Sequence, residues 1–366
     1  MVAACVSMTD LSLFEHTSRQ LTRLCDVIGF SEHDRRVAIE LLSELLGPSG
    51  AYPLFWPPLS DSNVADDATP VEFSLAFDTS GEYAIRVLGE RVGTSSPREF
   101  LDVLTVRYGL DPRRLDAVSD LFLPHDERQG PFTLWYSLIF RAGHAPGIKV
   151  YLNPQISGRT LADSLVHEGF RRLRMGKAFE PVIEHALRRG ERDNFTFFAL
   201  DLNRDPRSRV KVYIEHDAAR PADAERAASL VPGLDPLSIR DFCAVLGGGN
   251  GTFAARPLIS SYSFVEGDET RPSNYSLYLP IRSYVPDDEV ALARVRAILA
   301  EYDFDGSKLD DAISAISERE LRDGVGLIPH VSLRMGEVNP GITVYLSSEA
   351  YRVMPARKRP MLGIGH

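Results

Sequence analysis

The hydrophobic and polar positions along the chain follow two periods, one typical of helices and one typical of strands. Apolar residues recur at three- to four-residue spacing over residues 11–28 and 33–46, which predicts two amphipathic helices. Residues 71–78 (VEFSLAFD) and 82–88 (EYAIRVL) alternate apolar and polar side chains on either side of a TSG turn, which predicts a β-hairpin. The first unit of the chain is therefore predicted to be helix, helix, strand, strand.

The same order of two helices and a hairpin recurs four more times. The second strands of the five hairpins align on a shared three-residue core, and the starts of successive cores are 63, 62, 65 and 67 residues apart. Such regular self-similarity indicates a repeat architecture. The later helices are predicted at 96–109, 111–122, 160–173, 178–189, 222–231, 236–246, 287–302 and 307–320. The five cores read RVL, KVY, KVY, SLY and TVY, and begin at Arg86, Lys149, Lys211, Ser276 and Thr343.

Five such units supply ten antiparallel strands. A sheet of this size tends to curl, and closing it removes its unpaired edges. Ten strands enclose more room than the side chains of an eight-stranded barrel fill, so we expect a ligand cavity. We therefore expect an α+β fold with a single domain over residues 1–366: a closed ten-stranded antiparallel β-barrel, ringed by outer α-helices and built from five ααββ repeats. Its hairpins are predicted at about 71–88, 132–152, 195–215, 258–281 and 330–347.

Composition narrows the classes of protein that fit. The chain has 366 residues, a net charge of −10 and 44% hydrophobic residues, as in an ordinary globular protein. An acidic chain is a poor nucleic-acid binder, because neutralising phosphates needs a basic face. No apolar run is long enough to span a membrane, and the first residues lack the basic region of an export signal. Three cysteines without metal-ligand spacing indicate buried thiols in a reducing cytoplasm.

The KVY segments raise the question of which face points into the barrel. A strand alternates faces, so lysine and tyrosine share one face and valine takes the other. In an isolated strand the lysine would more often face solvent. Here, however, repeated amphipathic helices must cover an apolar outer face of the strands. We therefore expect the valines outside, and Arg86, Lys149, Arg209, Lys211 and the four tyrosines Tyr151, Tyr213, Tyr278 and Tyr345 inside.

This inward set combines two kinds of chemistry. Clustered arginine and lysine side chains bind phosphate or diphosphate, arginine through a fork of donors and lysine as a point charge. Tyrosine faces attract cations, while tyrosine hydroxyls can still bond to phosphate oxygens. Together they fit the departure of diphosphate from an allylic prenyl donor, with the resulting carbocation shielded by aromatic rings.

Two further residues have alternative interpretations. Glu72 alternates with Ser74 and Ala76, so it either faces the cavity or is a solvent-exposed residue at a strand edge. In the cavity it could accept the N–H of an indole or the O–H of a phenol and raise the nucleophilicity of the ring. Arg334 in HVSLRMG is either another cavity cation or an exposed hairpin residue.

Motifs for metal-bound or loop-bound diphosphate are incomplete in this sequence. The segments DDAT (66–69) and DDEV (287–290) each lack a second carboxylate cluster one helical turn on. We interpret them as a loop and a helix N-terminus, where acidic residues complement the helix dipole. The segment GGGNG (247–251) follows a helix rather than a strand, so it is a connector rather than a phosphate cradle. Protein cations are thus expected to neutralise the diphosphate.

Five segments of the sequence, taken in order, resemble a known family. The segments VEFSL, KVYLNP, VKVYIEH, YSLYLPI and TVYL, in this order between about residues 72 and 351, are similar to aromatic prenyltransferases of the dimethylallyltryptophan synthase type, and to their bacterial branch in length. The resemblance implies the αββα prenyltransferase barrel, formed by a monomer or homodimer in the cytoplasm. It also implies metal-independent, Friedel-Crafts-type transfer of a dimethylallyl group from dimethylallyl diphosphate to L-tryptophan or a related indole, in alkaloid biosynthesis and other secondary metabolism. No cofactor is then required, and Mg²⁺ is at most stimulatory.

The resemblance also implies roles for individual residues. Glu72 matches the glutamate that hydrogen-bonds the indole N–H. Ser276 departs from the glutamine of fungal members, and Trp135 or Tyr136, which we expect to contact the acceptor, stands where fungal members have a deprotonating lysine. The expected diphosphate-binding residues are Arg86, Lys149, Arg209, Lys211 and Arg334, and the expected carbocation shield is Tyr151, Tyr213, Tyr278 and Tyr345.

Three alternatives stay open from the sequence. The same chemistry could act on a phenol, a naphthoquinone or a cyclic dipeptide, because Glu72 does not choose among N–H and O–H donors. A non-catalytic barrel could bind an anionic amphiphile without using Glu72. A nucleotide-binding barrel would prefer ATP to an isoprenoid diphosphate.

Overall fold

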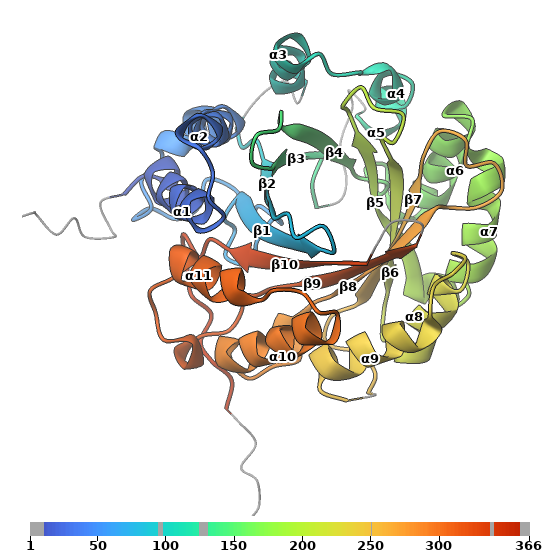
Figure 1. Ribbon diagram of the computed structural model, residues 1–366. Coiled ribbons are helices and arrows are strands. Elements are labelled where there is room, and N and C mark those ends of the chain that lie inside the picture. The colour runs from blue at the N-terminus through green and yellow to red at the C-terminus, as the bar shows by residue number, and fades with distance from the viewer. Residues whose placement is uncertain (1–10, 94–97, 124–130, 250, 337–339, 359–366) are drawn as a thin grey trace, which may run out of the picture.

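The computed structural model describes residues 11–93, 98–123, 131–249, 251–336 and 340–358. Its ten strands form one closed antiparallel barrel in which each strand pairs with its neighbours in sequence and β1 closes against β10 (Figure 1). This arrangement confirms the predicted fold class. The strands are β1 (Val71–Asp78), β2 (Ala84–Glu90), β3 (Leu134–Phe140), β4 (Gly147–Leu152), β5 (Asp193–Asp201), β6 (Val210–His216), β7 (Leu258–Phe264), β8 (Asn274–Leu279), β9 (Val331–Gly336) and β10 (Gly341–Ser347).

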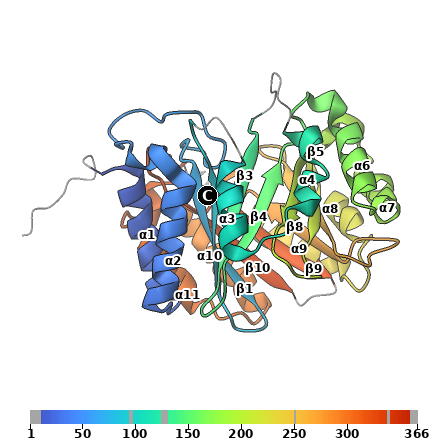
Figure 2. The same ribbon diagram turned by 90° about the horizontal axis from the view of Figure 1, so that it is seen from above.

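Helices surround the barrel on its outer side (Figures 1 and 2). Four of the described helices are started by side chains that accept backbone N–H groups. For example, Ser12 forms a capping box with Glu15 before α1, and Asp287 accepts the Val290 N–H before α10. The second cap confirms that DDEV begins a helix, and Asp66 of DDAT lies in a loop as expected. The helices are α1 (Leu13–Val27), α2 (Glu32–Leu46), α3 (Glu99–Tyr108), α4 (Arg113–Asp116), α5 (Ser119–Phe122), α6 (Ala162–Arg172), α7 (Gly176–Ala186), α8 (Pro221–Ala228), α9 (Pro236–Gly247), α10 (Asp288–Glu301) and α11 (Ser307–Ile316).

One predicted helix differs from the structure. Residues 111–122 were expected to form a single helix but form the one-turn helices α4 and α5. The break is at Val118, whose backbone (φ −124°, ψ 0°) leaves the helical region while its side chain is fully buried. The helical periodicity of the segment therefore does not show this break.

The main hydrophobic core lies between the barrel and its helices. The central apolar residues of the KVY cores are completely buried in this layer, so the outward orientation of these residues is confirmed. They are Val87, Val150, Val212, Leu277 and Val344. Because strand neighbours point to opposite faces, the flanking cations and tyrosines face the barrel interior.

Two expectations from composition can be compared with the structure. No helix in the described part of the chain is long and apolar enough to cross a membrane. Cys25 and Cys243 are buried free thiols, as expected, and burial raises the pKa of each to about 12. Cys5 lies outside the described residues.

Candidate active site

The barrel interior contains two chambers that share part of their lining. We call them the cation chamber, which contains Arg86 and Lys149, and the aromatic chamber, which contains Trp135 and Phe197. Their volumes are about 850 and 1320 Å³, including solvent-open space. The residues common to both linings are Glu72, Leu88, Tyr151, Tyr278 and Tyr345.

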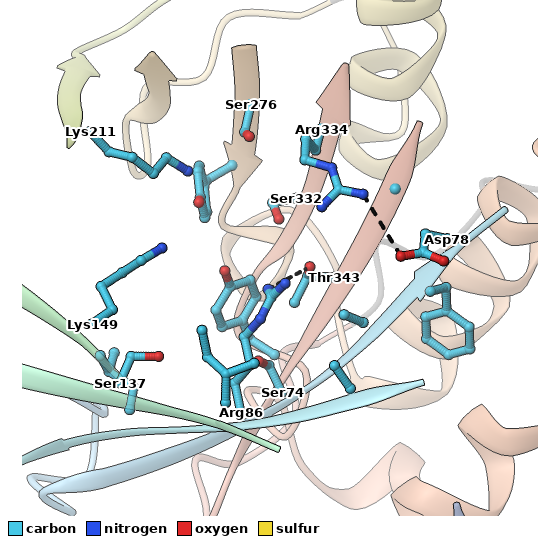
Figure 3. Close-up of a pocket in the computed structure, with 18 of the residues that line it drawn as sticks. Ser74, Asp78, Arg86, Ser137, Lys149, Lys211, Ser276, Ser332, Arg334 and Thr343 are labelled. Carbon is cyan, nitrogen blue, oxygen red and sulfur yellow. Dashed lines mark hydrogen bonds and ion pairs between the residues drawn. The ribbon is translucent and has the colours of Figure 1, made fainter. Parts of the chain in front are cut away.

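All five predicted diphosphate-binding cations line the cation chamber. Lys149 and Lys211 extend into it from one side, and Arg86 and Arg334 face them from the other (Figure 3). Arg334 therefore faces the barrel interior, although it approaches Asp78 at 3.9 Å near the rim. Arg141, directly after β3, also lines this chamber and was missed, because it lies beyond the aligned strand cores.

Asp201 is the buried counter-ion of the cation chamber. Its carboxylate lies 3.2 Å from the Lys149 Nζ and 2.7 Å from the Arg209 Nε. Burial lowers the pKa of Lys149 to about 8, and Asp201 opposes this shift. The same carboxylate raises the pKa of Arg209, and the two cations hold the pKa of Asp201 below its usual range despite burial. Sequence reasoning missed Asp201, although it alternates with the inward-facing Phe197 and Ala199 on β5.

Lys211 is buried without such a counter-ion. Among the described residues no carboxylate forms an ion pair with its ammonium group. Burial and the neighbouring Lys149 and Arg209 hold its pKa well below the usual value. Burial and the charge of Arg86 likewise lower the pKa of Arg334 to about 10. The chamber thus carries excess positive charge that an anion would relieve.

Small hydroxyl side chains accompany these cations. Across the strands, Arg86 is paired with Ser74, Lys149 with Ser137, Lys211 with Ser263 and Arg334 with Ser276. A serine opposite each long side chain leaves room for that side chain to reach the chamber and adds a hydrogen-bond donor. Three of these serines stand in repeated Ser-Leu pairs, in FSLAF, YSLIF and YSLYL, which are the sequence signal for them, whereas Ser263 is followed by Phe264. Ser276, where the charge pattern breaks, also lines the chamber.

The four predicted tyrosines form a continuous belt around the interior. The ring centroids of Tyr151 and Tyr213 are 5.7 Å apart, those of Tyr213 and Tyr278 are 5.6 Å apart, and those of Tyr278 and Tyr345 are 6.1 Å apart. Lys149 lies 5.9 Å from the Tyr151 ring and Lys211 lies 5.1 Å from the Tyr213 ring. The belt therefore separates a cationic space from an aromatic one.

Glu72 lies where the two chambers meet. It is 5% exposed, so it is not the solvent-exposed strand-edge residue of the alternative interpretation. Burial raises the pKa of its carboxyl to about 8, partly opposed by the charge of Arg282. No described side chain or backbone group donates a hydrogen bond to it. This arrangement leaves the carboxyl available to a ligand.

The aromatic chamber contains Trp135 but not Tyr136. Trp135 stacks on Phe132 with centroids 4.3 Å apart and lies 5.3 Å from Phe197. Tyr136 is the next residue of β3 and points outward, where its ring packs edge-on against Phe100 of α3. The expectation that Tyr136 contacts the acceptor is therefore wrong, because adjacent strand residues face opposite ways.

A metal site is not evident in the part of the chain that the structure describes. No group of three or more His, Cys, Asp or Glu side chains is placed there to hold an ion. The described lining of the two chambers provides cations, hydroxyls, aromatic rings and the Glu72 carboxyl.

Comparison with known proteins gives a consistent result. The family model of tryptophan dimethylallyltransferase matches residues 14–310. A 6-dimethylallyltryptophan synthase from Micromonospora olivasterospora is 48% identical, with a TM-score of 0.90 over 94% of this chain and 99% of that chain. A 5-dimethylallyltryptophan synthase from Streptomyces coelicolor is 37% identical, with a TM-score of 0.87 over 93% and 99%. AnaPT from Neosartorya fischeri, 15% identical with a TM-score of 0.73 over 93% of each chain, shares the fold. The chain belongs to the tryptophan dimethylallyltransferase family.

Proposed function

We propose that the protein transfers a dimethylallyl group from dimethylallyl diphosphate to the indole ring of L-tryptophan or a close derivative. The observation that carries this proposal is the meeting of a cation chamber and an aromatic chamber at a belt of tyrosines. Two further observations support it. The relatives from M. olivasterospora and S. coelicolor have been solved in complex with DMASPP and Trp. Glu72 offers a carboxyl at the junction, which suits an indole N–H.

In this mechanism the diphosphate binds among Arg86, Lys149, Arg209, Lys211 and Arg334. The carbon–oxygen bond of the donor breaks, and its electron pair leaves with the diphosphate, whose growing charge is stabilised by preorganised cations. The faces of Tyr151, Tyr213, Tyr278 and Tyr345 surround the allylic cation and exclude water.

The acceptor ring then attacks the cation from the aromatic chamber. Glu72 accepts the indole N–H and pushes electron density into the ring, while Trp135 and Phe197 hold the ring by stacking. A new bond forms between the ring and the allyl carbon, and loss of a ring proton to a base restores aromaticity. The diphosphate charge is neutralised by protein side chains, so we expect activity without added metal and at most a stimulation by Mg²⁺.

We also propose that the enzyme works in the cytoplasm, where a reducing environment keeps buried thiols such as Cys25 and Cys243 free. Its product would be a prenylated amino acid, a building block for secondary metabolism.

The direct test is an incubation of the purified protein with dimethylallyl diphosphate and L-tryptophan in the presence of EDTA. We expect a product heavier by one dimethylallyl group in mass spectrometry, and its NMR spectrum gives the site of attachment. Absence of such a product with a panel of indoles and phenols would overturn the catalytic proposal. Loss of product only when EDTA is present would overturn the metal-independent mechanism.

A further inference from the structure

The inward face of β10 differs from the corresponding strands of the first three units. The aligned cores of those units begin with a cation, at Arg86, Lys149 and Lys211, but the fifth core begins with Thr343. Two residues before it, β10 has Gly341, and both residues line the cation chamber. This strand therefore adds no cation to the chamber at the place where three other units add one.

Thr343 forms a hydrogen bond with Arg86 across an intervening strand. Thr343 is 7% exposed, and its Oγ1 accepts a hydrogen bond from the Arg86 Nη1 at 3.0 Å (Figure 3). Both β2 and β10 pair with β1, so the Arg86 side chain must cross β1 to reach this hydroxyl. The residues of β1 opposite the two partners are Ser74 and Ala76, whose small side chains leave room for the guanidinium. A residue two strands away thus sets the direction of the Arg86 guanidinium.

Gly341 makes room for a second arginine of the chamber. It lies directly opposite Arg334 on β9, and a Cβ at this position would be 2.7 Å from the Arg334 Nη2 and 3.1 Å from its Cζ. A side chain here would push the guanidinium out of its present place, from which it approaches Asp78 at 3.9 Å. Glycine permits this close approach because it has no Cβ. The strand therefore holds one arginine by a hydrogen bond and admits the other by the absence of a side chain.

Charge explains why a threonine suits this place better than a lysine. The Arg86 guanidinium already lies against the side chain of residue 343. A lysine there would bring a second cation next to it, and like charges repel strongly in a buried chamber. The neutral hydroxyl of Thr343 instead occupies one of the five N–H donors of the guanidinium and leaves the others to an anion.

We propose that Thr343 and Gly341 are positioning residues for the diphosphate of the prenyl donor. They keep the guanidinium groups of Arg86 and Arg334 on one side of the cation chamber, facing its two lysines (Figure 3). A guanidinium that is already oriented offers an anion two parallel donors and loses little side-chain freedom on binding. The fifth unit thus acts through its neighbours rather than by a charge of its own. The inference rests on the proposed function, because the anion is the leaving group of dimethylallyl transfer.

The main test is Thr343→Val, which removes the hydroxyl and keeps the β-branched shape of the side chain. Calorimetry on the full-length protein gives the Kd of inorganic diphosphate, and steady-state kinetics give KM for dimethylallyl diphosphate and for L-tryptophan. Loss of the orienting hydrogen bond should raise the Kd of diphosphate and KM of the donor by about three- to tenfold. KM for L-tryptophan should change by less than about twofold, because the acceptor does not use this contact. Thr343→Ser keeps a hydroxyl and should restore most of the donor affinity.

A double-mutant cycle separates positioning from direct contact with the anion. Because Thr343 acts through Arg86, Thr343→Val should not weaken diphosphate binding further in an Arg86→Met background. Gly341→Ala should likewise weaken diphosphate binding in the wild type but not in an Arg334→Met background. Thr105→Val, on the outer helix α3, is the control and should leave all three constants unchanged.

Two results would overturn the inference. One is an unchanged Kd of diphosphate in Thr343→Val. The other is an equal loss of diphosphate affinity with and without Arg86, which would mean that the Thr343 hydroxyl contacts the anion itself. If Thr343→Val weakens diphosphate binding only when Arg86 is present, but the wild-type protein forms no prenylated product, the proposed function fails while the positioning role stands.

Discussion

Lys149 and Asp201 lie directly opposite each other on β4 and β5, and the Lys149 Nζ is 3.2 Å from the Asp201 carboxylate. Arg209 approaches the same carboxylate at 2.7 Å. This single anion is therefore the counter-ion of both the buried Lys149 and the partly buried Arg209. A bound diphosphate would supply further negative charge to the same cations, which links the stability of the fold to the occupancy of the chamber.

The first prediction concerns Asp201→Asn. The substitution leaves the buried Lys149 and the partly buried Arg209 without their shared anion, so the free energy of unfolding should fall by about 3–5 kcal/mol in urea denaturation. Inorganic diphosphate replaces the lost charge and should therefore raise the melting temperature of the variant more than that of the wild type. Asp205→Asn, on the exposed turn that follows β5, is the matched control and should change stability little. Equal stabilisation of Asp201→Asn and wild type by diphosphate would contradict the argument.

The second prediction concerns protons that are taken up when the diphosphate binds. In the free protein the pKa of Lys149 is about 8, so this lysine is partly neutral at pH 8.5. Burial and the neighbouring Lys149 and Arg209 also hold the pKa of Lys211 well below its usual value. A bound anion raises both pKa values, and binding must then take up protons.

This uptake can be measured by calorimetry in buffers of different ionisation enthalpy. We expect proton uptake at pH 8.5 that decreases as the pH is lowered, because a lysine that is already protonated takes up no further proton. Lys149→Met should remove part of the uptake, whereas Lys177→Met, on the outer helix α7, should not. Proton release in the wild type would show that the lysine pKa values are wrong.

The fold was predictable from the sequence because its signals are periodic. Two-residue alternation marked the strands, three- to four-residue spacing marked the helices, and five near-equal steps showed that both belong to one closed repeat. The sequence was insufficient at Val118, where the backbone leaves the helical region although the apolar spacing of the segment continues.

The site was most predictable where a residue type repeats at the same register. The aligned cores offered Arg86, Lys149, Lys211 and the four tyrosines, and alternation within single strands offered Arg209 and Glu72 as candidates. Asp201 occurs once and Arg141 lies beyond the strand core, so neither has a repeat to reveal it. Trp135 and Tyr136 point to opposite faces because they are adjacent on β3. The family resemblance alone does not decide which of the two points into the barrel.

The third prediction concerns the pH dependence of acceptor use. The pKa of Glu72 is about 8 because of burial, so this group is mostly protonated at neutral pH and becomes an anionic acceptor as the pH rises. When the donor is saturating, kcat/KM for L-tryptophan should therefore rise with pH, and this rising limb should have its midpoint near pH 8. Glu72→Gln should lose this limb and about a hundredfold or more in kcat/KM, while donor binding stays unchanged. Glu82→Gln changes a residue that lines the cation chamber, and as the control it should keep the rising limb of the pH profile. If the rising limb persists in Glu72→Gln, the titration belongs to another group.

The fourth prediction concerns the tyrosine belt. Tyr213 is 2% exposed and lies between Tyr151 and Tyr278, so Tyr213→Leu removes a central aromatic face and opens space for water next to the allylic cation. Loss of a desolvated cation–π contact of about 2 kcal/mol should reduce kcat by more than tenfold. The more specific result is a change in products.

Water admitted to the cation competes with the indole ring, so the variant should release more dimethylallyl alcohol for each prenylated product. This ratio is measured by liquid chromatography with radiolabelled donor, and it does not depend on how much of the protein is folded. Tyr136→Leu is the matched control, because Tyr136 packs outward against Phe100 and its loss weakens the core without opening the chamber. An equal rise of the alcohol ratio in both variants would mean that general loosening of the barrel, rather than the missing aromatic face, admits the water.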